Sequence, residues 1–377
     1  MGDRKGALET LDITLGMTLG MKAEFWKGRR VLVTGHTGFK GAWLALWLDS
    51  LGARVSGFAL EPETEPNLWR LLDLDARVHS RIADICDRAA VARALDEDKP
   101  EIVFHLAAQS LVRRSYREPE ETFAANVGGV VTLLHAISQA PSVKATVIAT
   151  SDKCYENLEE DRPFTEEDRF GGRDPYSASK GCAEIAAAAM RQSFFAPYRK
   201  DGASARIATA RAGNVIGGGD WSEDRLAPDI VRGCLGPKAQ TIIRSPRSVR
   251  PWQHVLEPLR GYVMLAERLA DGADVDGGWN FGPDEKDART VLEAATKLAA
   301  SLGRGKIVVE ENPDAPHEAK LLRLDAGKAI KSLGWRPALG FDEGIEMTAA
   351  WYRAHHDGAN ARDLTLRQID EYMRKAS

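Results

Sequence analysis

The sequence predicts an α/β protein built on a doubly wound parallel sheet, with a smaller mixed α/β lobe attached. Short apolar segments of strand length alternate with helical patterns up to about residue 212, which is the rhythm of a parallel sheet covered on both faces. Beyond that point the rhythm breaks, and the chain becomes richer in Arg and Pro. We therefore expect an N-terminal extension at 1–25, a sheet domain at 26–212 with part of 250–285, and a second lobe formed mainly by 213–249 and 286–377.

The first strand–helix junction is the strongest local signal. Residues 31–33 are apolar and of strand type, Gly35, Gly38 and Gly41 follow at regular spacing, and a helical pattern begins by Trp43. A strand, a glycine turn and a helix start bring free backbone N–H groups and the positive end of a helix dipole to one point, which suits a pyrophosphate. A glycine-rich corner that binds nothing has the same pattern, so the rest of the chain must decide.

The next segments are typical of an NAD site, with one departure. Residues 53–60 form the second predicted strand, and an acidic residue normally closes this strand to accept ribose hydroxyls. Here Glu61 comes late, and no Arg stands at the position of a 2′-phosphate clamp, so NAD is favoured over NADP. After the third predicted strand, 77–82, Asp84 is a candidate for the adenine amino group. The alternative is the N-cap of a helix over 88–97.

Two further strands bring small and polar residues to the same edge of the sheet. The strand predicted at 101–106 ends in small residues, which let a cofactor lie against the backbone. The strand predicted at 145–150 runs into Ser and Asp. Asn126 lies in a helix predicted over 118–139, where the alternative is a solvent-facing side chain.

Tyr176 and Lys180 are the first residues with an evident chemical role. Four positions apart on a helix, they share a face. A lysine ammonium near a phenol lowers the cost of ionising it, so Tyr176 is expected to act as a base at neutral pH. Such a pair arises often by chance, but this one follows a glycine turn and a strand that ends in Thr150, Ser151 and Asp152. The order of these elements is strong evidence that they work together.

With these residues in place, the sequence resembles the extended short-chain dehydrogenase/reductase family, from Phe25 to about Arg374. The resemblance implies a Rossmann-type NAD-binding domain and a substrate-binding lobe. Within the family the chain is similar to the dehydratases of CDP-sugars, and His36, Phe39 and Lys40 set it apart from the related epimerases. The motifs that carry the resemblance are Thr34–Gly41, Thr150–Tyr155, Arg211–Trp221 and Arg250–Val255.

The resemblance implies a lyase that converts CDP-D-glucose to CDP-4-dehydro-6-deoxy-D-glucose without net oxidation, with tightly held NAD⁺ as a transient hydride store. It implies that Tyr176, helped by Lys180, removes the proton of the C4 hydroxyl, and that Asp152 donates a proton to the leaving C6 hydroxyl. Lys153 stands where related dTDP-glucose dehydratases have Glu, so we expect it to handle the C5 proton or to orient water or the enolate. The alternative is a lysine that merely pairs with Asp152.

The same resemblance assigns two sets of ligand contacts, and it expects no metal. Arginine forks suit a diphosphate, although for any one Arg a plain surface position is the alternative. The segments Trp279–Gly282 and His317–Ala319 also match the family and are expected to line the nucleotide or sugar pocket. Ser151 is expected beside the catalytic residues. The expected NAD contacts are Gly35, His36, Thr37, Gly38, Phe39, Lys40, Gly41, Asp84, Ile85, Ala107, Ala108, Gln109, Asn126, Thr150, Tyr176 and Lys180, and the expected substrate contacts are Asn214, Arg225, Arg244, Arg250 and Asn280.

Composition narrows the remaining possibilities. The net charge of −4 gives no general basic field for nucleic acid. Four separated cysteines, without a C-x-x-C pair, argue against a disulfide framework and fit a reducing cytoplasm. No apolar run approaches the ~20 residues of a membrane span. Residues 1–20 are interpreted as an upstream extension before Met21. The resemblance implies a homodimer or higher homo-oligomer, paired through the helices that contain Asn126 and Tyr176.

Three rival hypotheses stay open at this point. They are a nucleotide-sugar epimerase, a 4,6-dehydratase for another nucleotide, and a non-catalytic NAD-binding sensor. The sensor is disfavoured because Asp152, Tyr176 and Lys180 are all present.

Overall fold

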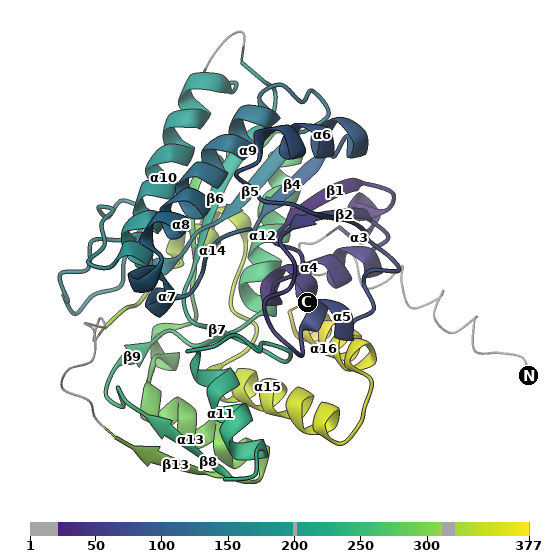
Figure 1. Ribbon diagram of the computed structural model, residues 1–377. Helices are drawn as coiled ribbons and strands as arrows, with labels where there is room; N and C mark the ends of the chain where they lie inside the picture. Colours follow the sequence, from purple (N-terminus) through teal and green to yellow (C-terminus); the bar gives the residue numbers. More distant parts are fainter. Residues whose placement is uncertain (1–21, 199–201, 311–320, 377) are drawn as a thin grey trace, which may run out of the picture.

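The chain folds around a seven-stranded parallel sheet (Figure 1). The computed structural model describes residues 22–198, 202–310 and 321–376. The strand order is β11-β6-β5-β4-β1-β2-β3, so the winding reverses between β1 and β4, and the predicted fold class is confirmed. The strands are β1 (Arg30–Thr34), β2 (Arg54–Ala59), β3 (His79–Ile82), β4 (Ile102–His105), β5 (Ala145–Ala149), β6 (Arg206–Ala212) and β11 (Gly277–Phe281).

Alternate residues of the strands enter two hydrophobic cores on opposite faces of the sheet. In β1, Leu32 belongs to one core, whereas Val31 and Val33 belong to the other. Because both faces are covered, the strands are apolar along their whole length. The first core is covered by α6 (Arg88–Asp98), α9 (Gly129–Ile137) and α10 (Pro175–Phe194), and the second by α4 (Phe39–Ser50), α12 (Leu256–Ala270) and α14 (Gly327–Leu333).

A smaller group of elements follows β6 and lies at one side of the sheet domain (Figure 1). Its short strands form three pairs, β7 with β10, β9 with β12 and β8 with β13. Helix α13 packs between α11 and α15. The bounds are β7 (Val215–Ile216), α11 (Leu226–Leu235), β8 (Gln240–Ile243), β9 (Val249–Arg250), β10 (Gln253–His254), η3 (Glu285–Asp287), β12 (Arg289–Thr290), α13 (Val291–Leu302), β13 (Lys306–Val309) and α15 (Phe341–His356).

Both ends of the described chain pack on the sheet domain. Helix α3 (Ala23–Trp26) buries Trp26, whose Nε1 donates to Glu267 of α12 at 2.7 Å. Lys22 pairs with Asp271 at 2.8 Å, so the described end of the predicted extension contacts α12. Helix α16 (Ala361–Lys375) packs on α4 and α15. Residues 1–21 and the predicted substrate segment His317–Ala319 lie outside the described residues.

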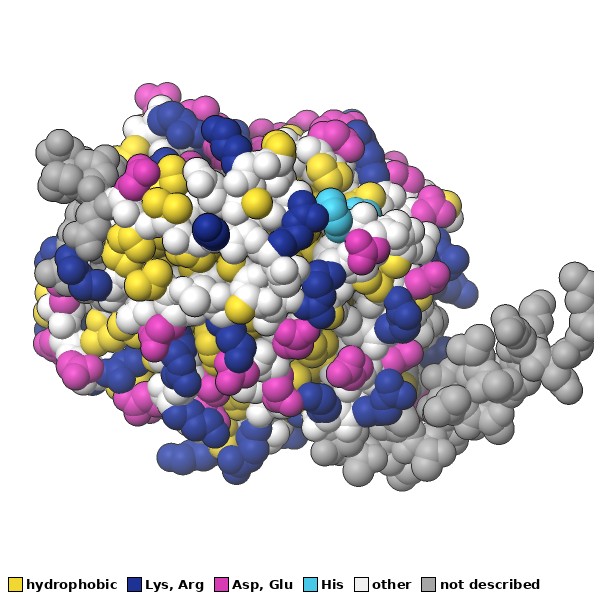
Figure 2. All heavy atoms as spheres, turned by 90° about the horizontal axis from the view of Figure 1, so that it is seen from below, with side chains coloured by type: hydrophobic (Ala, Val, Ile, Leu, Met, Phe, Trp, Pro, Cys, Tyr) yellow, Lys and Arg dark blue, Asp and Glu magenta, His cyan; other side chains and the backbone are white. Residues whose placement is uncertain are grey.

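The surface mixes charges of both signs on the face seen from below. Figure 2 shows Lys and Arg side chains interspersed with Asp and Glu over this face. Among the described residues, no helix is long and apolar enough to cross a membrane.

Candidate functional site

The glycine turn joins β1 to α4 at the carboxyl edge of the sheet. Gly35 has a φ of +74°, and a Cβ there would lie 2.6 Å from the backbone nitrogen of Ala107 after β4. A Cβ on Gly41 would lie 2.1 Å from the Gly35 oxygen, so the helix start and the turn touch. Gly38 is exposed and caps α4 without any side-chain hydrogen bond. The first N–H groups of α4 therefore open at this edge, where an anion is stabilised.

His36 lies behind this turn. Its Nε2 is 2.7 Å from the Ser80 hydroxyl of β3, and its ring meets Trp69 edge-on at 4.5 Å. A Cβ on Gly57 of β2 would lie 2.4 Å from the imidazole, so that glycine provides the space for it. Burial lowers the pKa of His36 to about 4, which keeps the ring neutral. His36 thus supports the turn from below, in place of the predicted cofactor contact.

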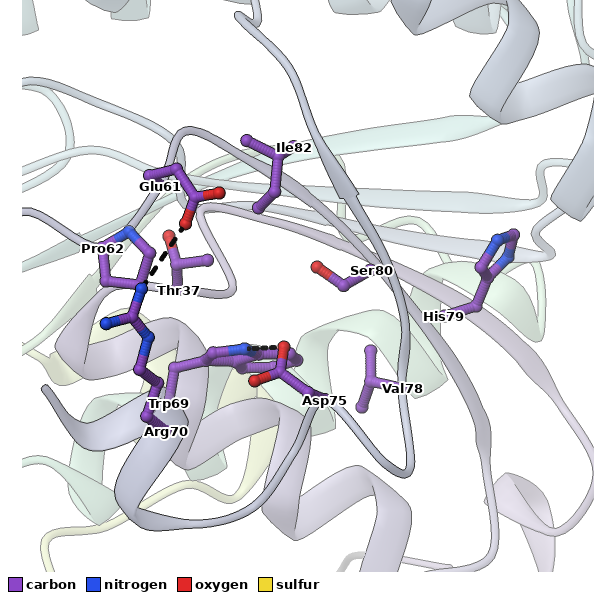
Figure 3. Close-up of a pocket in the computed structure, with 10 residues that line it drawn as sticks. All are labelled: Thr37, Glu61, Pro62, Trp69, Arg70, Asp75, Val78, His79, Ser80 and Ile82. Carbon is purple, nitrogen blue, oxygen red and sulfur yellow. Dashed lines mark hydrogen bonds and ion pairs between the residues drawn. The ribbon is translucent and has the colours of Figure 1, made fainter.

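A cavity of about 540 Å³ opens beside the turn (Figure 3). Thr37 faces it, with Oγ1 donating to the Leu60 carbonyl at 2.9 Å. Glu61 reaches it from the segment after β2 and pairs with Arg70 of α5 (Leu68–Leu71) at 3.8 Å. Glu61 comes later in the sequence than the usual acidic residue at the end of β2, but it still lines this cavity. No Arg stands at the clamp position in the sequence, but α5 brings Arg70 to this wall, where it pairs with Glu61. The other lining residues are Pro62, Trp69, Asp75, Val78, His79, Ser80 and Ile82.

The segment after β3 corrects one predicted alternative. Asp84 is exposed and accepts from the Cys86 N–H at 2.8 Å, so it closes a local turn. Helix α6 is capped by Asp87, whose carboxylate accepts from Ala89 and Ala90, so Asp84 is not the N-cap. Ile85 is buried against Gly129 of α9.

Gln109 and Asn126 form a buried polar link between the end of β4 and α10. Asn126 lies in the π-helical turn η1 (Ala124–Gly128) between α8 (Pro119–Phe123) and α9. The three follow one another without a break, so the long helix predicted over 118–139 is present with one π-helical turn inside it. It is 2% exposed, and its Nδ2 donates to the Gln109 carbonyl at 3.0 Å and to Ser179 at 2.8 Å. The solvent-facing alternative is therefore wrong. Its Oδ1 is buried without a partner in the described protein.

Tyr176 and Lys180 lie in the first two turns of α10, which begins at Pro175 behind an Asp174 cap. Both are nearly buried, and Lys180 Nζ lies 5.9 Å from the centroid of the phenol ring. Burial raises the pKa of Tyr176 to about 12, against an opposing hydrogen bond with Ser151. Burial also lowers the pKa of Lys180 to about 8. In the chain alone, burial therefore dominates the pKa of Tyr176, and the charge that opposes it is that of Arg225.

The acid segment η2 (Asp152–Cys154) follows β5 and faces α10. Ser151 Oγ donates to Asp152 Oδ1 at 2.9 Å, while Asp152 Oδ2 is buried without a partner in the described protein. Burial raises the pKa of Asp152, and the nearby Lys153 opposes this shift. No ion pair joins Lys153 to Asp152 in the described part of the chain, which goes against the hypothesis of a simple pair. The segment thus offers a buried carboxyl with one oxygen available to a ligand.

Lys40 extends from the glycine turn toward these groups. Burial lowers its pKa to about 7, with Arg225 and Lys180 acting in the same direction and Asp152 opposing. Phe39, its neighbour, instead packs over Gly217, where a Cβ would lie 3.1 Å from the Phe39 Cζ. The turn therefore brings a second lysine to the predicted catalytic groups.

Four of the five predicted substrate residues fall into three groups by position. Arg250 is buried and its charge acts on Asp152, and Arg225 bridges to Ser110 at 2.8 Å, so both lie between the lobe and the sheet edge. Asn214 is half-buried, and its carbonyl accepts from Gln253 at 3.0 Å. Arg244 is exposed after β8. Among the described residues, no hydrogen bond or ion pair joins Arg244 to the predicted catalytic groups.

Asn280 and Thr150 turn away from the sheet edge into a buried network. Asn280 is fully buried, accepts from the Tyr155 hydroxyl at 2.7 Å and donates to the Phe164 carbonyl at 3.0 Å. Its predicted substrate contact is corrected, because its side chain is bonded within the core. The Thr150 hydroxyl donates to Glu184. Sequence reasoning missed Glu184, although its place one turn after Lys180, on the same helix face, was a usable signal.

These residues fit a dinucleotide. The open start of α4 offers an anion site, and the cavity beside Thr37 and Glu61 offers a polar wall. The unpartnered Asn126 Oδ1 offers a buried acceptor. Ala107 and Ala108 add partly exposed small residues at the end of β4, as predicted.

Comparison with known proteins agrees with this geometry. The model of the family described as GDP-mannose 4,6 dehydratase matches residues 32–348. CDP-glucose 4,6-dehydratase of Salmonella typhimurium is 48% identical over 350 residues, covering 93% of this chain and 97% of the relative. dTDP-glucose 4,6-dehydratase 1 of Escherichia coli is 29% identical, covering 86% of this chain and 92% of the relative. A dTDP-glucose 4,6-dehydratase from Streptomyces venezuelae, solved with NAD bound, has a TM-score of 0.72 at 26% identity, covering 87% of this chain and 98% of that one.

Proposed function

Because the chain belongs to the GDP-mannose 4,6 dehydratase family, we propose that it converts CDP-D-glucose to CDP-4-dehydro-6-deoxy-D-glucose with loss of water. The observation that carries this proposal is the similarity to the Salmonella CDP-glucose dehydratase along nearly the whole chain. The geometry supports it, since a buried acid segment faces a Tyr/Lys helix at the edge of a dinucleotide fold.

NAD is the cofactor that this site would hold, through the start of α4, the cavity beside Thr37 and Glu61, and Asn126. When bound, it supplies a hydride acceptor, returns the hydride later and adds a positive charge. The residues of this chain move the protons. Tyr176 takes the proton of the C4 hydroxyl, and the Lys180 ammonium stabilises the phenolate.

The elimination falls to the acid segment. Oxidation at C4 leaves a ketone, which acidifies the hydrogen on C5, and Lys153 takes that proton. Asp152, kept protonated by burial, gives its proton to the C6 hydroxyl, and water leaves. Once C6 has received a hydride, Lys153 would return its proton to C5. The proton gained by Tyr176 would then replace, through solvent, the one that Asp152 lost, so the atoms balance as the sugar nucleotide minus one water.

Turnover of three sugar nucleotides tests the proposal. We expect the purified protein to convert CDP-glucose to a product that absorbs in alkali as 4-keto-6-deoxy sugars do, and to convert dTDP- and UDP-glucose much more slowly. Preference for another nucleotide would reassign the substrate. An absence of alkaline absorbance with all three would favour an epimerase or a binding sensor.

The role of Lys153 has its own test. In D₂O, the wild-type product should carry deuterium at C5, because the base exchanges its proton with solvent. Lys153→Met should slow this exchange by about 10²–10⁴-fold. Exchange at the normal rate in that variant would remove Lys153 as the base and leave it an orienting role.

We further propose a homodimer in the cytoplasm. Helices α8, α9 and α10 carry exposed apolar side chains, among them Val131 at 40% and Ile185 at 57% exposure, and these support pairing along this face. Light scattering of the wild type and of Ile185→Lys tests the pairing. A monomeric wild type would contradict it.

A further inference from the structure

A buried ion pair lies one helical turn beyond Lys180 on the same face of α10. The side chains of Glu184 and Arg211 are each 3% exposed, and Arg211 Nε and Nη2 both donate to the Glu184 carboxylate at 2.8 Å. Thr209 donates to the same carboxylate at 2.6 Å, and Thr150 donates as well. Helix α10 is thereby bonded to the ends of β5 and β6 through one carboxylate.

The other side of Arg211 is equally enclosed. Its Nη1 donates to the Tyr155 hydroxyl at 2.6 Å, and its guanidinium lies over the rings of Tyr155 and Phe170 at 5.2 and 4.9 Å. A Cβ on Gly278 of β11 would lie 2.1 Å from Arg211 Nη2, so this strand makes room for the charge. The pair therefore joins the ends of β5 and β6 to α10, with space left for it by β11.

Removing two charges from water is costly, and apolar residues of the same volume often stabilise a core as well or better. The position of the pair suggests what it provides. Thr150 directly precedes Ser151 and Asp152, and Lys180 lies one turn before Glu184 on the same helix face. Asp152 is thus two residues from Thr150, which bonds to Glu184, and Lys180 is one turn from Glu184 itself.

We propose that Glu184, held by Arg211 and bonded to Thr150, is a positioning residue that fixes the part of α10 carrying Lys180 against the acid segment. The inference rests on the proposed function for the role of Lys180. Several charged or titratable groups face this amine, and burial lowers its pKa to about 8 while Glu184 opposes that shift. The groups are Glu184 and Tyr176 on α10, Cys154 in η2, His105 on β4 and Lys40 in α4. Of these, Glu184 is the one that carries a negative charge near neutral pH.

Glu184→Gln removes the charge and keeps the size of the side chain. The pKa of Lys180 should then fall, so the ammonium is lost at lower pH. The alkaline limb of the kcat profile should move toward acid by roughly one pH unit, with KM for CDP-glucose changed less than about twofold. A readout without substrate is the pH dependence of Lys180 acylation, followed by mass spectrometry, which should shift by the same amount.

Two further variants keep the test decisive. Glu184→Gln leaves Arg211 uncompensated and is prone to misfold, so Glu184→Gln with Arg211→Gln restores charge balance and should still show a smaller acid shift. Glu257→Gln on α12, where the carboxyl is equally buried but bonded to Ala338, Leu339 and Tyr372, should leave the acylation profile unchanged.

The outcomes separate the two proposals. An unchanged Lys180 profile in a folded Glu184 variant, or an equal shift in Glu257→Gln, overturns the positioning role. A shifted profile in a protein that does not dehydrate any sugar nucleotide overturns the proposed function and leaves this role in place.

Discussion

Asp152 combines burial with an oxygen to which no described group of the protein donates a hydrogen bond. One carboxylate oxygen accepts from Ser151, and the other is buried and unpartnered. An unsatisfied buried polar atom costs free energy, so its retention indicates a ligand group at that place. The raised pKa of Asp152 adds the proton that an acid must donate.

Asp152→Asn keeps the shape and removes the proton. Oxidation at C4 should proceed, but departure of the C6 hydroxyl should slow by about 10²–10⁴-fold. Enzyme-bound reduced cofactor should therefore build up, visible by its near-ultraviolet absorbance in a single turnover. Product formation at the wild-type rate, without that build-up, would contradict the acid role.

Tyr176→Phe should block the oxidation at C4, which precedes the departure of the C6 hydroxyl. The variant lacks the group that takes the C4 proton, so kcat should fall by about 10²–10⁴-fold while NADH still binds. No reduced cofactor should accumulate, in contrast to Asp152→Asn. Ser177→Ala is the control, because Ser177 bonds to the Asp174 cap at 2.6 Å and should retain most activity. A fully active Tyr176→Phe would reassign the base.

At the scale of elements, the junction of β1 and α4 depends on two glycines for different reasons. Gly41 has no room for a Cβ, which would lie 2.1 Å from the Gly35 oxygen, whereas a Cβ on Gly38 would lie at an ordinary 3.4 Å from the same atom. Gly41 thus holds the turn on the helix, and Gly38 leaves the helix start open.

The two alanine variants should therefore differ. Gly41→Ala should lower the free energy of unfolding by about 1–3 kcal/mol, because overpacking displaces the turn, and it should weaken NADH binding. Gly38→Ala should keep the stability but still weaken binding, because the methyl group stands where the ligand approaches. Thermal unfolding and NADH fluorescence titration measure both quantities. Unchanged NADH affinity in Gly38→Ala would remove the pyrophosphate from this helix start.

Elements were predictable where local chemistry decides them. The apolar strands and the glycine turn follow from short patterns, and each predicted strand of the sheet is present with small shifts at its ends. The long helix over 118–139 was predictable too, but its π-helical turn η1 was not. Within that turn the Asn126 side chain bonds to Gln109 and Ser179, which are distant in sequence.

At the scale of the whole molecule, buried titratable groups link stability to pH. Burial lowers the pKa of His254 to about 3 and raises the pKa of Glu257 to about 7. The unfolded chain binds a proton at His254 below about pH 6.5, so the stability from this group is complete above that pH and falls with pH toward 3. Glu257 acts oppositely, since its folded pKa is raised, and its contribution falls as pH rises from about 4.5 to 7.

Two variants should change the pH slope with opposite signs. Between about pH 4.5 and 6.5, His254→Gln should make stability fall less steeply on acidification, by about 1.4 kcal/mol per pH unit, whereas Glu257→Gln should make it fall more steeply by a similar amount. Denaturant unfolding at a series of pH values measures this. Parallel curves for wild type and His254→Gln would show that His254 titrates alike in both states.

The sequence by itself determined the fold class, a doubly wound parallel sheet, and the glycine turn. It also determined the pairs Tyr176–Lys180 and Ser151–Asp152. Each of these features depends on neighbours within one strand, turn or helix face. Only the tertiary structure decided that His36 turns under the sheet edge, that Arg70 comes to the cavity wall with Glu61, and that Asn280 serves the core. It also brought Glu184 to Arg211. Such contacts join residues far apart in the chain, and which side chain fills a buried space depends on the space that the packed neighbours leave.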